Sequence, residues 1–371
     1  MKVVVYGLSN EGYSIAKLLA LKGIDTAIVD EGKGMAISIR QEIAMSYATV
    51  DALIYDEPLL RVEPESTAIA NADYIFFTPI IKRIGQDAHS DISSRLKSIS
   101  RNLKRDASLV YCLPTIIGGS KEIIDVIKYS TSSKIKYIYM PITPDGSVYL
   151  VGSDSVKDDM IYYVARELNN GMDIEYIDIR SAELLYARSI IANYTPLIIT
   201  FDLCRTVDDI MLNTLADKKG MSDIFIDDLV SALFDIHILA YIDNHNTVHI
   251  INNCIKIIEG YKKHLVDRIK YILKKRELRA SKTRVLLAWD TKINSMRNDR
   301  SIVLSDLSNR LKDHIEEVGR YYHTRGIYRD DKVVIILTCS RRDNERVLER
   351  YNGKEDIIII KANPLCEVVR Q

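Results

Sequence analysis

A glycine-containing turn near the start of the chain combines residue types and a spacing that could bind a diphosphate. It comes directly after a β-branched strand pattern at residues 2–6 and directly before an apolar helical pattern, and it consists of Gly7, Leu8, Ser9, Asn10, Glu11 and Gly12. A strand, a glycine turn and a helix in this order direct free backbone N–H groups and the positive end of a helix dipole toward one point. We therefore predict that this turn binds the diphosphate of a dinucleotide.

An acidic residue after the next strand supports the same interpretation. Asp30 ends the strand pattern at residues 26–29, where its carboxylate could bind a ribose hydroxyl and so favour NAD over NADP. The fingerprint is incomplete, because Ser9 replaces the middle glycine that lets a diphosphate approach the backbone. A tight turn without a ligand is the alternative.

Two more strand patterns end in loops with polar residues. Residues 72–79 form an apolar run that ends in Thr78 and a proline, and residues 108–113 form another that leads into a loop containing Thr115. Ligands of open parallel sheets bind at the carboxyl ends of the strands. We therefore expect Thr78 and Thr115 to join the glycine turn and Asp30 in one cofactor site at a shared edge.

The elements that position these residues indicate an α/β protein built around one long helix. Short β-branched runs alternate with helical patterns on both sides of residues 247–278. In that stretch apolar residues recur every three or four positions, at Cys254, Ile258, Tyr261, Leu265, Ile269 and Ile272. A helix of this size is about 45 Å long, which suits a connection between two α/β units. A long amphipathic helix packed on a core, without a connecting role, is the alternative.

Composition places the chain among ordinary folded proteins. Its 371 residues are 47% hydrophobic and 27% charged, which excludes a disordered chain, and no apolar run approaches a membrane span. The start of the chain shows no signal pattern, and five cysteines without a CxxC pair indicate reduced thiols, so we expect a cytoplasmic protein.

Charge is balanced overall and uneven locally. The chain has 51 basic and 51 acidic residues, so the molecule as a whole does not attract nucleic acid. The basic stretch, residues 262–284 from Lys262 to Arg284, is the exception. It is either a solvated helix face or a site for a nucleic acid or another acidic partner.

The order of motifs resembles the UDP-glucose/GDP-mannose dehydrogenase family. The segments GLSNEG, ADYIFFTP, LPTIIGG and MPITPDGSVYLVG follow the family's order, and SAELLY at residues 181–186 is similar to the opening of its central helix. After the long helix, VLLAW and Met296-Arg297 resemble a later family segment, and residues 333–338 resemble its next strand.

This resemblance implies a fold of two Rossmann-like domains joined by a central helical segment with one long connecting helix. It implies an NAD-binding domain at residues 1–180, a central helical and dimerisation segment at 181–278, and a C-terminal domain at 279–371 similar to the family's UDP-sugar-binding domain. It also implies NAD as cofactor, a homodimer through the long helix, a catalytic role for Thr115 and a substrate-binding role for Arg297.

The family's catalytic residues are largely missing from this sequence. Its four-electron oxidation of a sugar alcohol uses a cysteine nucleophile in a glycine-rich loop, and residues 220–246 contain no such loop; residues 224–241 instead predict a continuous helix. Other positions of the family carry a different residue type in this chain. The family's glutamate is replaced by Ile142, its two lysines by Tyr186 and Asp290, and its asparagine by Ile190, unless a shift of the alignment makes Asn193 equivalent to that asparagine. Such groups act as a unit, so losing several together is expected to abolish the reaction.

Other residues of the chain could substitute for these groups. Tyr186 could act as a general acid or base, and Cys204 as a nucleophile, although Cys204 lies in an apolar run that favours a buried structural thiol. His237, Asp243, His245 and His249 have a spacing that a metal could use, but surface or capping histidines are the better interpretation, and no metal is predicted.

These observations predict a divergent nucleotide-sugar dehydrogenase-like protein that binds NAD(H) and has lost the four-electron oxidation. One alternative is an active two-electron NAD-dependent oxidoreductase in which Thr115, Tyr186 and a water act on another substrate. The other is a catalytically inactive interaction scaffold, in which the basic stretch contacts its partner.

Overall fold

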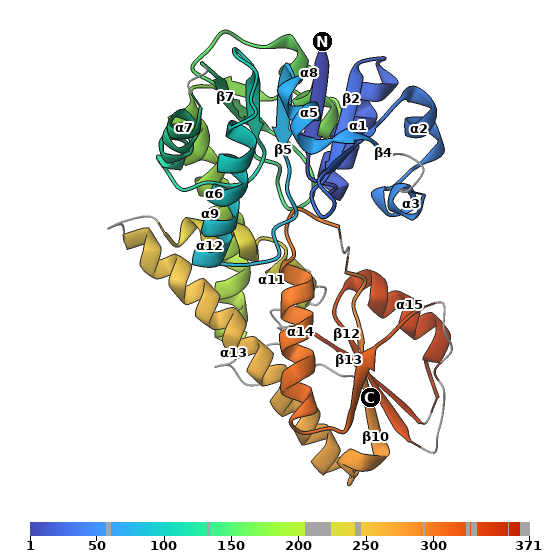
Figure 1. Ribbon diagram of the computed structural model, residues 1–371. Helices are drawn as coiled ribbons and strands as arrows, with labels where there is room; N and C mark the ends of the chain where they lie inside the picture. Colours follow the sequence, from blue (N-terminus) through green and yellow to red (C-terminus); the bar gives the residue numbers. More distant parts are fainter. Residues whose placement is uncertain are drawn as a thin grey trace. The chain divides into compact units, whose positions relative to one another are not determined.

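The structure of the chain, a computed structural model, describes residues 1–56, 61–131, 134–204, 224–241, 246–291, 294–323, 327, 332–354 and 356–363. The chain divides into two compact units (Figure 1). Unit 1 comprises residues 1–190, 234–248 and 293–298, and unit 2 comprises residues 191–233, 249–292 and 299–371. The chain therefore passes between the units several times, and a six-residue stretch of unit 1 separates two long stretches of unit 2.

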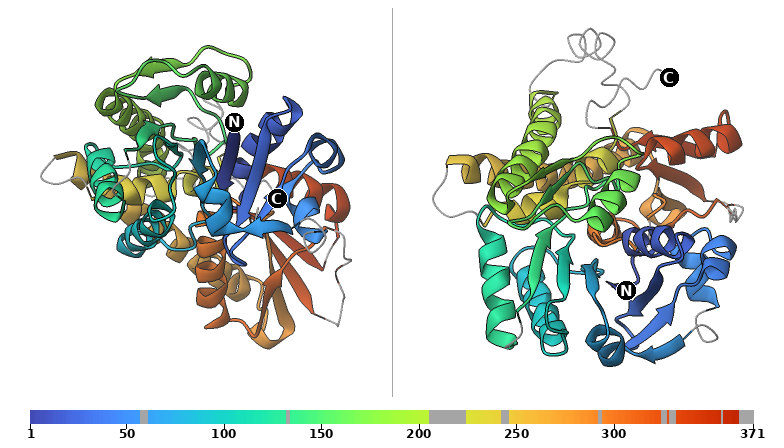
Figure 2. Two further views of the ribbon diagram at one scale, coloured as in Figure 1. Left: turned by 45° about the horizontal axis from the view of Figure 1, so that its top comes forward. Right: turned by 90° about the horizontal axis from the view of Figure 1, so that it is seen from above.

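Unit 1 contains a nine-stranded sheet with the strand order β4-β3-β2-β1-β5-β6-β7-β8-β9. Its centre, from β2 to β7, is parallel, whereas β3 and β4 add antiparallel strands at one side and β8 pairs antiparallel with β7 at the other. Figure 2 shows this order as a change of strand colour from blue to green across the sheet. The strands are β1 (Lys2–Tyr6), β2 (Asp25–Asp30), β3 (Met35–Ser38), β4 (Arg61–Pro64), β5 (Tyr74–Phe77), β6 (Ser108–Tyr111), β7 (Lys136–Tyr139), β8 (Leu150–Gly152) and β9 (Glu175–Ile177).

The central strands of unit 1 are buried on both faces, which explains their continuous apolar sequences. Rings at their carboxyl ends stack from strand to strand, with Tyr6 against Phe77 and Phe77 against Tyr111. Helix α1 packs against α2 and α8, and α6 packs against α7. The helices of this unit are α1 (Asn10–Leu21), α2 (Gln41–Ser46), α3 (Val50–Tyr55), α5 (Glu65–Ala70), α6 (Gln86–Ser100), α7 (Gly119–Ser130) and α8 (Asp159–Leu168).

The strand order creates a topological switch point between β1 and β5. From β1 the chain leads through α1 to β2 on one side, and the later strands β5, β6 and β7 follow on the other side. At such a point the loops after the two central strands diverge and leave a crevice at the carboxyl edge of the sheet. The loops after β1 and β5 begin at Gly7 and Thr78, so the structure confirms that these loops share one edge.

Unit 2 contains a second, four-stranded parallel sheet with the order β11-β10-β12-β13. Its strands are β10 (Thr283–Ala288), β11 (Glu317–Arg320), β12 (Val333–Thr338) and β13 (Ile357–Lys361), with the short turn η2 (Ala280–Lys282) before them. Helix α14 (Asp299–Lys312) contacts β11, and α15 (Arg341–Tyr351) contacts β12 and β13. The switch point of this sheet lies between β10 and β12.

Two long helices connect these elements along the chain. The predicted long helix is confirmed as α13 (Asn246–Lys275), with 30 residues. Of its predicted apolar stripe, five positions are buried and the last, Ile272, is half-buried. The central helix predicted to open at residues 181–186 is α9 (Ile179–Cys204). Both helices have residues in each unit.

Two sequence interpretations require correction. The prediction of one continuous helix at residues 224–241 is wrong, because the structure has α11 (Ile226–Val230) and α12 (Leu233–Leu239) separated by a turn at Ser231 and Ala232. The sequence pattern of residues 32–55 indicates helical or irregular structure, and the region does contain α2 and α3, but it also contains the antiparallel strand β3. The predicted domain boundaries at residues 180 and 278 stay a prediction.

Candidate functional site

The glycine turn after β1 has the tight geometry that its sequence predicts. Gly7 has φ +118°, and a Cβ there would lie 2.2 Å from the carbonyl oxygen of Thr78. A Cβ at Gly12 would lie 2.5 Å from Thr78 Oγ1. Both glycines therefore let the first turn of α1 lie directly against the loop after β5, where a side chain would separate them.

Ser9, the residue in place of the middle glycine, points into the protein. Its side chain is 0% exposed, its hydroxyl donates to the Thr78 carbonyl oxygen at 2.9 Å, and it accepts from the Gly12 N–H at 3.0 Å. Ser9 is thus the N-cap of α1 and also fastens the turn to the loop after β5. This inward bonding explains how a serine is accommodated at a position where the fingerprint has glycine.

Asp30 lies at the end of β2, as predicted, and organises the turn that follows. Its Oδ1 accepts from the Gly32 N–H at 3.0 Å. The neighbouring Glu31 forms an ion pair with Arg95 of α6 at 2.6 Å. Burial raises the pKa of Glu31, an effect that Arg95 partly opposes. The strand end next to the glycine turn therefore carries two acidic residues, Asp30 and Glu31.

A short segment at residues 294–297, which we call the crossing segment, spans the switch point of unit 1. At one side the Asn10 N–H donates to the Asn294 carbonyl oxygen at 2.6 Å. At the other side the Ile81 N–H donates to the Met296 carbonyl oxygen at 3.0 Å. Asn10 begins α1, and Ile81 belongs to the loop after β5, so the segment joins the two loops that diverge from the switch point.

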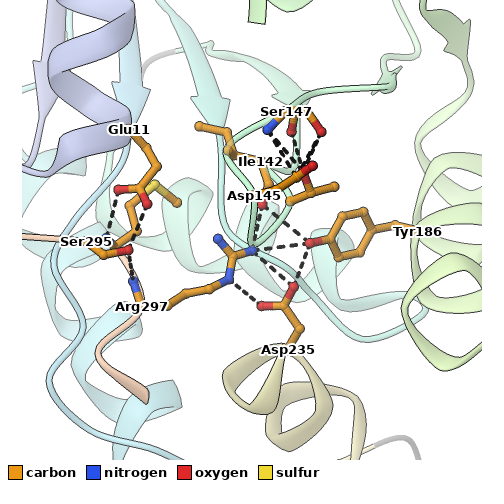
Figure 3. A network of polar contacts seen from close by, with 10 residues as sticks. Glu11, Ile142, Asp145, Ser147, Tyr186, Asp235, Ser295 and Arg297 are labelled. Atoms are coloured by element: carbon orange, nitrogen blue, oxygen red, sulfur yellow. Dashed lines mark hydrogen bonds and ion pairs between the residues drawn. The ribbon is translucent and has the colours of Figure 1, made fainter. Parts of the chain in front are cut away.

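Further contacts fix the crossing segment at its side chains. Glu11 in the first turn of α1 accepts from the Ser295 hydroxyl at 2.7 Å and from the Met296 N–H at 3.0 Å (Figure 3). The Asn294 amide donates to Asp51 Oδ1 at 2.6 Å. Three elements of unit 1, namely α1, α3 and the loop after β5, therefore hold this one segment.

The crossing segment ends in Arg297, which lies at the centre of a buried polar network (Figure 3). Its Nε donates to Asp235 Oδ1 at 2.6 Å and its Nη2 to Asp235 Oδ2 at 3.1 Å. The Tyr186 hydroxyl donates to Asp235 Oδ2 at 2.7 Å, and Arg297 Nη2 also donates to the Ile142 carbonyl oxygen at 2.6 Å. Arg297 is 7% exposed, and Asp235 and Tyr186 are 0% exposed.

The electrostatics of this network favour fixed protonation states. Burial raises the pKa of Tyr186 well above its usual value, and the charge of Asp235 raises it further. Burial alone would lower the pKa of Arg297, but Asp235 and the neighbouring groups outweigh it and raise the pKa. The result is a charged Arg297 and a neutral Tyr186, and neither of these two groups exchanges protons near neutral pH, so they serve to orient the side chains around them.

Thr115 lies in the loop after β6, at the same sheet edge, and is 6% exposed. The loop is compact, because a Cβ at Gly119 would lie 2.1 Å from Thr115 Oγ1. Glu183 of α9, 1% exposed, accepts from the N–H groups of Gly118 and Ser120 at 2.6 and 2.7 Å. The Glu183 carboxylate therefore occupies the place at the N-terminus of α7 where a helix favours a bound anion.

The switch point of unit 2 is also bonded internally. In the loop after β10, the Trp289 indole N–H donates to Asp227 Oδ1 at 2.7 Å, and the Asp290 N–H donates to Asp343 Oδ2 at 3.0 Å. The loop after β12 contributes the Cys339 carbonyl oxygen, which accepts from the Asp227 N–H at 3.1 Å. Burial raises the pKa of Asp227, against the influence of Arg300.

Other predicted features can be placed as well. Cys112, Cys254 and Cys339 are buried free thiols; Asp243 and His245 lie outside the described residues, as does the side chain of Cys204. Among the parts of the chain that the structure describes, no group of His, Cys, Asp or Glu is arranged to hold a metal ion. In the same ranges no helix has the length and apolar character to cross a membrane.

The basic stretch is partly neutralised within unit 2. Lys262 is buried and forms ion pairs with Glu259 and Asp306. Asp306 also pairs with Arg310 at 3.1 Å. The first positive charge of the stretch is therefore engaged inside the fold, whereas Lys263 and Lys270 are more exposed.

The structure brings most of the predicted site residues to one sheet edge. Gly7 to Gly12, Thr78 and Arg297 lie around the switch point, and Thr115 and Tyr186 follow on the side of β6 and β7. Sequence reasoning missed Asp235, which pairs with Arg297, and Glu183, which binds the start of α7. A signal was present for Asp235, because an acidic residue stood in an otherwise apolar helical run.

No known family profile matches the sequence, and no curated protein matches it. Solved structures do match. A UDP-D-ManNAc dehydrogenase from Pyrococcus horikoshii is 14% identical, with 99% of this chain and 96% of that chain covered and a TM-score of 0.63. The UDP-N-acetyl-mannosamine dehydrogenase Cap5O from Staphylococcus aureus is 14% identical, with 92% and 89% covered and a TM-score of 0.59.

A third match is a UDP-glucose dehydrogenase from the archaeon Pyrobaculum islandicum. It is 12% identical, with 97% of this chain and 85% of that chain covered and a TM-score of 0.55. At these identities the matches establish the fold: the chain is an α/β protein with the architecture of UDP-sugar dehydrogenases over nearly its full length. The fold expected from the order of motifs is thereby confirmed.

Proposed function

We propose that this chain is a divergent nucleotide-sugar dehydrogenase-like protein that binds NAD(H) and does not carry out the four-electron oxidation of a UDP-sugar. The fold supports the dehydrogenase-like part of this proposal, because three solved UDP-sugar dehydrogenases share it. The finer parts rest on the residues at the sheet edge of unit 1.

The observation that carries NAD(H) binding is the glycine turn at the switch point. Gly7 and Gly12 hold the start of α1 against the loop after β5, which is where a dinucleotide lies in open α/β sheets. The N–H groups of the first turn of α1 would bind the diphosphate, and the Asp30 carboxylate at the end of β2 would bind a ribose hydroxyl. Bound NAD would supply hydride transfer.

The buried network supports the loss of the four-electron oxidation. That reaction needs a nucleophile and groups that give and take protons. Here the Tyr186 hydroxyl donates a hydrogen bond to Asp235, and Arg297 donates to the same side chain and to the Ile142 carbonyl oxygen. Because these three side chains are buried and bonded to one another, they form a structural core at this place, with fixed charges.

The binding part is tested by calorimetric titration of NAD and NADH into the purified protein and into an Asp30→Ala variant. We expect saturable binding to the wild type and weaker binding to Asp30→Ala, because the ribose loses its carboxylate partner. Asp87→Ala, which removes an exposed carboxylate of α6, is the charge-matched control and should bind as the wild type does. Equal binding to Asp30→Ala would place the nucleotide elsewhere.

The catalytic part is tested by mixing the protein with NAD and a UDP-sugar and following absorbance at the NADH band. UDP-glucose and UDP-N-acetyl-mannosamine are the first substrates to try, because the neighbours in fold are named for them. We expect no sustained turnover. Formation of two NADH per sugar over many turnovers would overturn the proposed loss, and one NADH per substrate would favour a two-electron oxidoreductase.

A further inference from the structure

The crossing segment lies where a dinucleotide would have to pass. It connects the loop after β1 with the loop after β5, and these are the two loops that border the switch point. A diphosphate bound to the start of α1 and a chain segment bonded to the same place exclude each other sterically. The contacts of this segment therefore bear on whether the cofactor site is open.

The backbone donors at the start of α1 are largely engaged. The N–H of Asn10 donates to the Asn294 carbonyl oxygen at 2.6 Å, and the N–H of Gly12 donates to Ser9 Oγ at 3.0 Å. These are two of the first free donors of the helix, which are the groups that bind a diphosphate. The first of them becomes available only when Asn294 moves away.

The charge at the start of α1 is also supplied by the chain. The Glu11 carboxylate lies in the first turn, where a negative charge is stabilised by the helix, and it accepts from the Ser295 hydroxyl and the Met296 N–H. A bound diphosphate would bring a second negative charge close to this carboxylate. Glu11 therefore favours the crossing segment over a diphosphate.

One charged donor in this region has no hydrogen-bond partner among the described residues. Arg297 follows Met296 directly and is 7% exposed. Its Nε and Nη2 both donate hydrogen bonds. Its Nη1 is buried without a hydrogen-bond acceptor in the described residues. A buried N–H group without an acceptor costs free energy. The closed arrangement thus leaves one charged donor unsatisfied.

We propose that residues 294–296 form a strap that closes the dinucleotide site, with Arg297 as its fixed end, so that NAD(H) binds only when the strap has left the start of α1. This inference rests on the proposed binding of NAD(H) at the glycine turn. The strap is held at one end by Asn294 and Asp51, and in the middle by Ser295 and Glu11. Loosening either contact shifts the population toward the open form and raises the apparent affinity.

The test uses two variants that loosen the strap without altering the backbone of the glycine turn. Asp51→Ala removes the acceptor of the Asn294 amide at an exposed position of helix α3, and Ser295→Ala removes the donor to Glu11. We expect each to raise the affinity for NADH, measured by calorimetry, by about threefold to tenfold, the worth of one net hydrogen bond. The Asp87→Ala control should leave the affinity unchanged.

The outcomes separate the strap from the proposed function. Binding of NADH by the wild type with equal or weaker binding by both variants would overturn the strap and leave the cofactor site intact. Absence of binding in the wild type and in the doubly substituted Asp51→Ala, Ser295→Ala protein would overturn both. Binding that appears only in the double variant would support both.

Hydrogen exchange measured by mass spectrometry gives a second readout on the wild-type chain. NADH should slow amide exchange in the peptide that covers residues 8–13 and should speed exchange in the peptide that covers residues 294–298, because the strap loses its partners. Slower exchange in both peptides would mean that the segment closes over bound cofactor, and it would overturn the inference even if a variant failed to fold.

Discussion

Replacing Asp235 by asparagine keeps the shape of the buried network and removes its negative charge. In the wild type the carboxylate accepts from Arg297 Nε at 2.6 Å, from Arg297 Nη2 at 3.1 Å and from the Tyr186 hydroxyl at 2.7 Å. Asparagine can accept some of these bonds, but it leaves the guanidinium of Arg297 buried without a counter-charge. The network should therefore lose most of the free energy that the ion pair contributes.

The expected size follows from the burial of the partners. Asp235 is 0% and Arg297 7% exposed, so water screens the pair little. Removing one partner of such a pair costs about 3–5 kcal/mol in the free energy of unfolding. For a unit of about two hundred residues this corresponds to a fall in the melting temperature of about 6–20 °C.

Differential scanning calorimetry of the wild type and Asp235→Asn measures this change. Asp267→Asn is the matched control, because Asp267 pairs with Lys270 at 3.5 Å with side chains 53% and 43% exposed. The control should cost less than about 0.5 kcal/mol. If Asp235→Asn lowered the melting temperature no more than this control does, the buried network would have no structural role and the reasoning would be refuted.

Three other substitutions in unit 1 should have measurable effects. Gly7→Ala should prevent folding of the glycine turn, because its Cβ would lie 2.2 Å from the Thr78 carbonyl oxygen. Gly23→Ala is the control, because nothing lies within 4 Å of its Cβ, and it should lower the melting temperature only by the modest cost of a positive φ. Tyr186→Phe should cost about 1–2 kcal/mol in a denaturant titration, since a buried carboxylate loses a donor; an unchanged midpoint would argue against the bond. Burial lowers the pKa of His89 below its usual 6.5, so the native state favours its neutral form. The contribution of neutral His89 to stability is complete above pH 6.5 and is lost as the pH falls toward the lower pKa of the native state. His89→Phe should therefore flatten the dependence of the melting temperature on pH in this range. An equal slope in both proteins would mean that other groups cause the pH dependence.

The sequence predicted the parts of the fold that depend on local patterns. The glycine turn, the central strands and the 30-residue helix α13 each carry a periodicity or a turn signal that is readable without tertiary information. The turn inside residues 224–241 carries no such signal, because Ser231 and Ala232 are compatible with a helix and tertiary packing decides the break. Strand β3 was missed because it is short and depends on pairing with β2.

The candidate site was predictable residue by residue, but its contacts were not. Gly7, Gly12 and Thr78 were placed at one edge because their loops follow the carboxyl ends of predicted parallel strands. The pairing of Arg297 with Asp235 joins positions 62 apart in the sequence, and that of Glu11 with Ser295 joins positions 284 apart. Such contacts depend on the path of the chain through both units, which no short-range pattern encodes.

A crystal structure of the protein with NADH tests the central claim most directly. The account predicts the diphosphate within hydrogen-bond distance of the N–H groups of Asn10 and Glu11, the ribose at Asp30, and residues 294–296 displaced from the start of α1. A nucleotide bound at another place would contradict this account. So would an Asn10 N–H still bonded to the Asn294 carbonyl oxygen in crystals saturated with NADH.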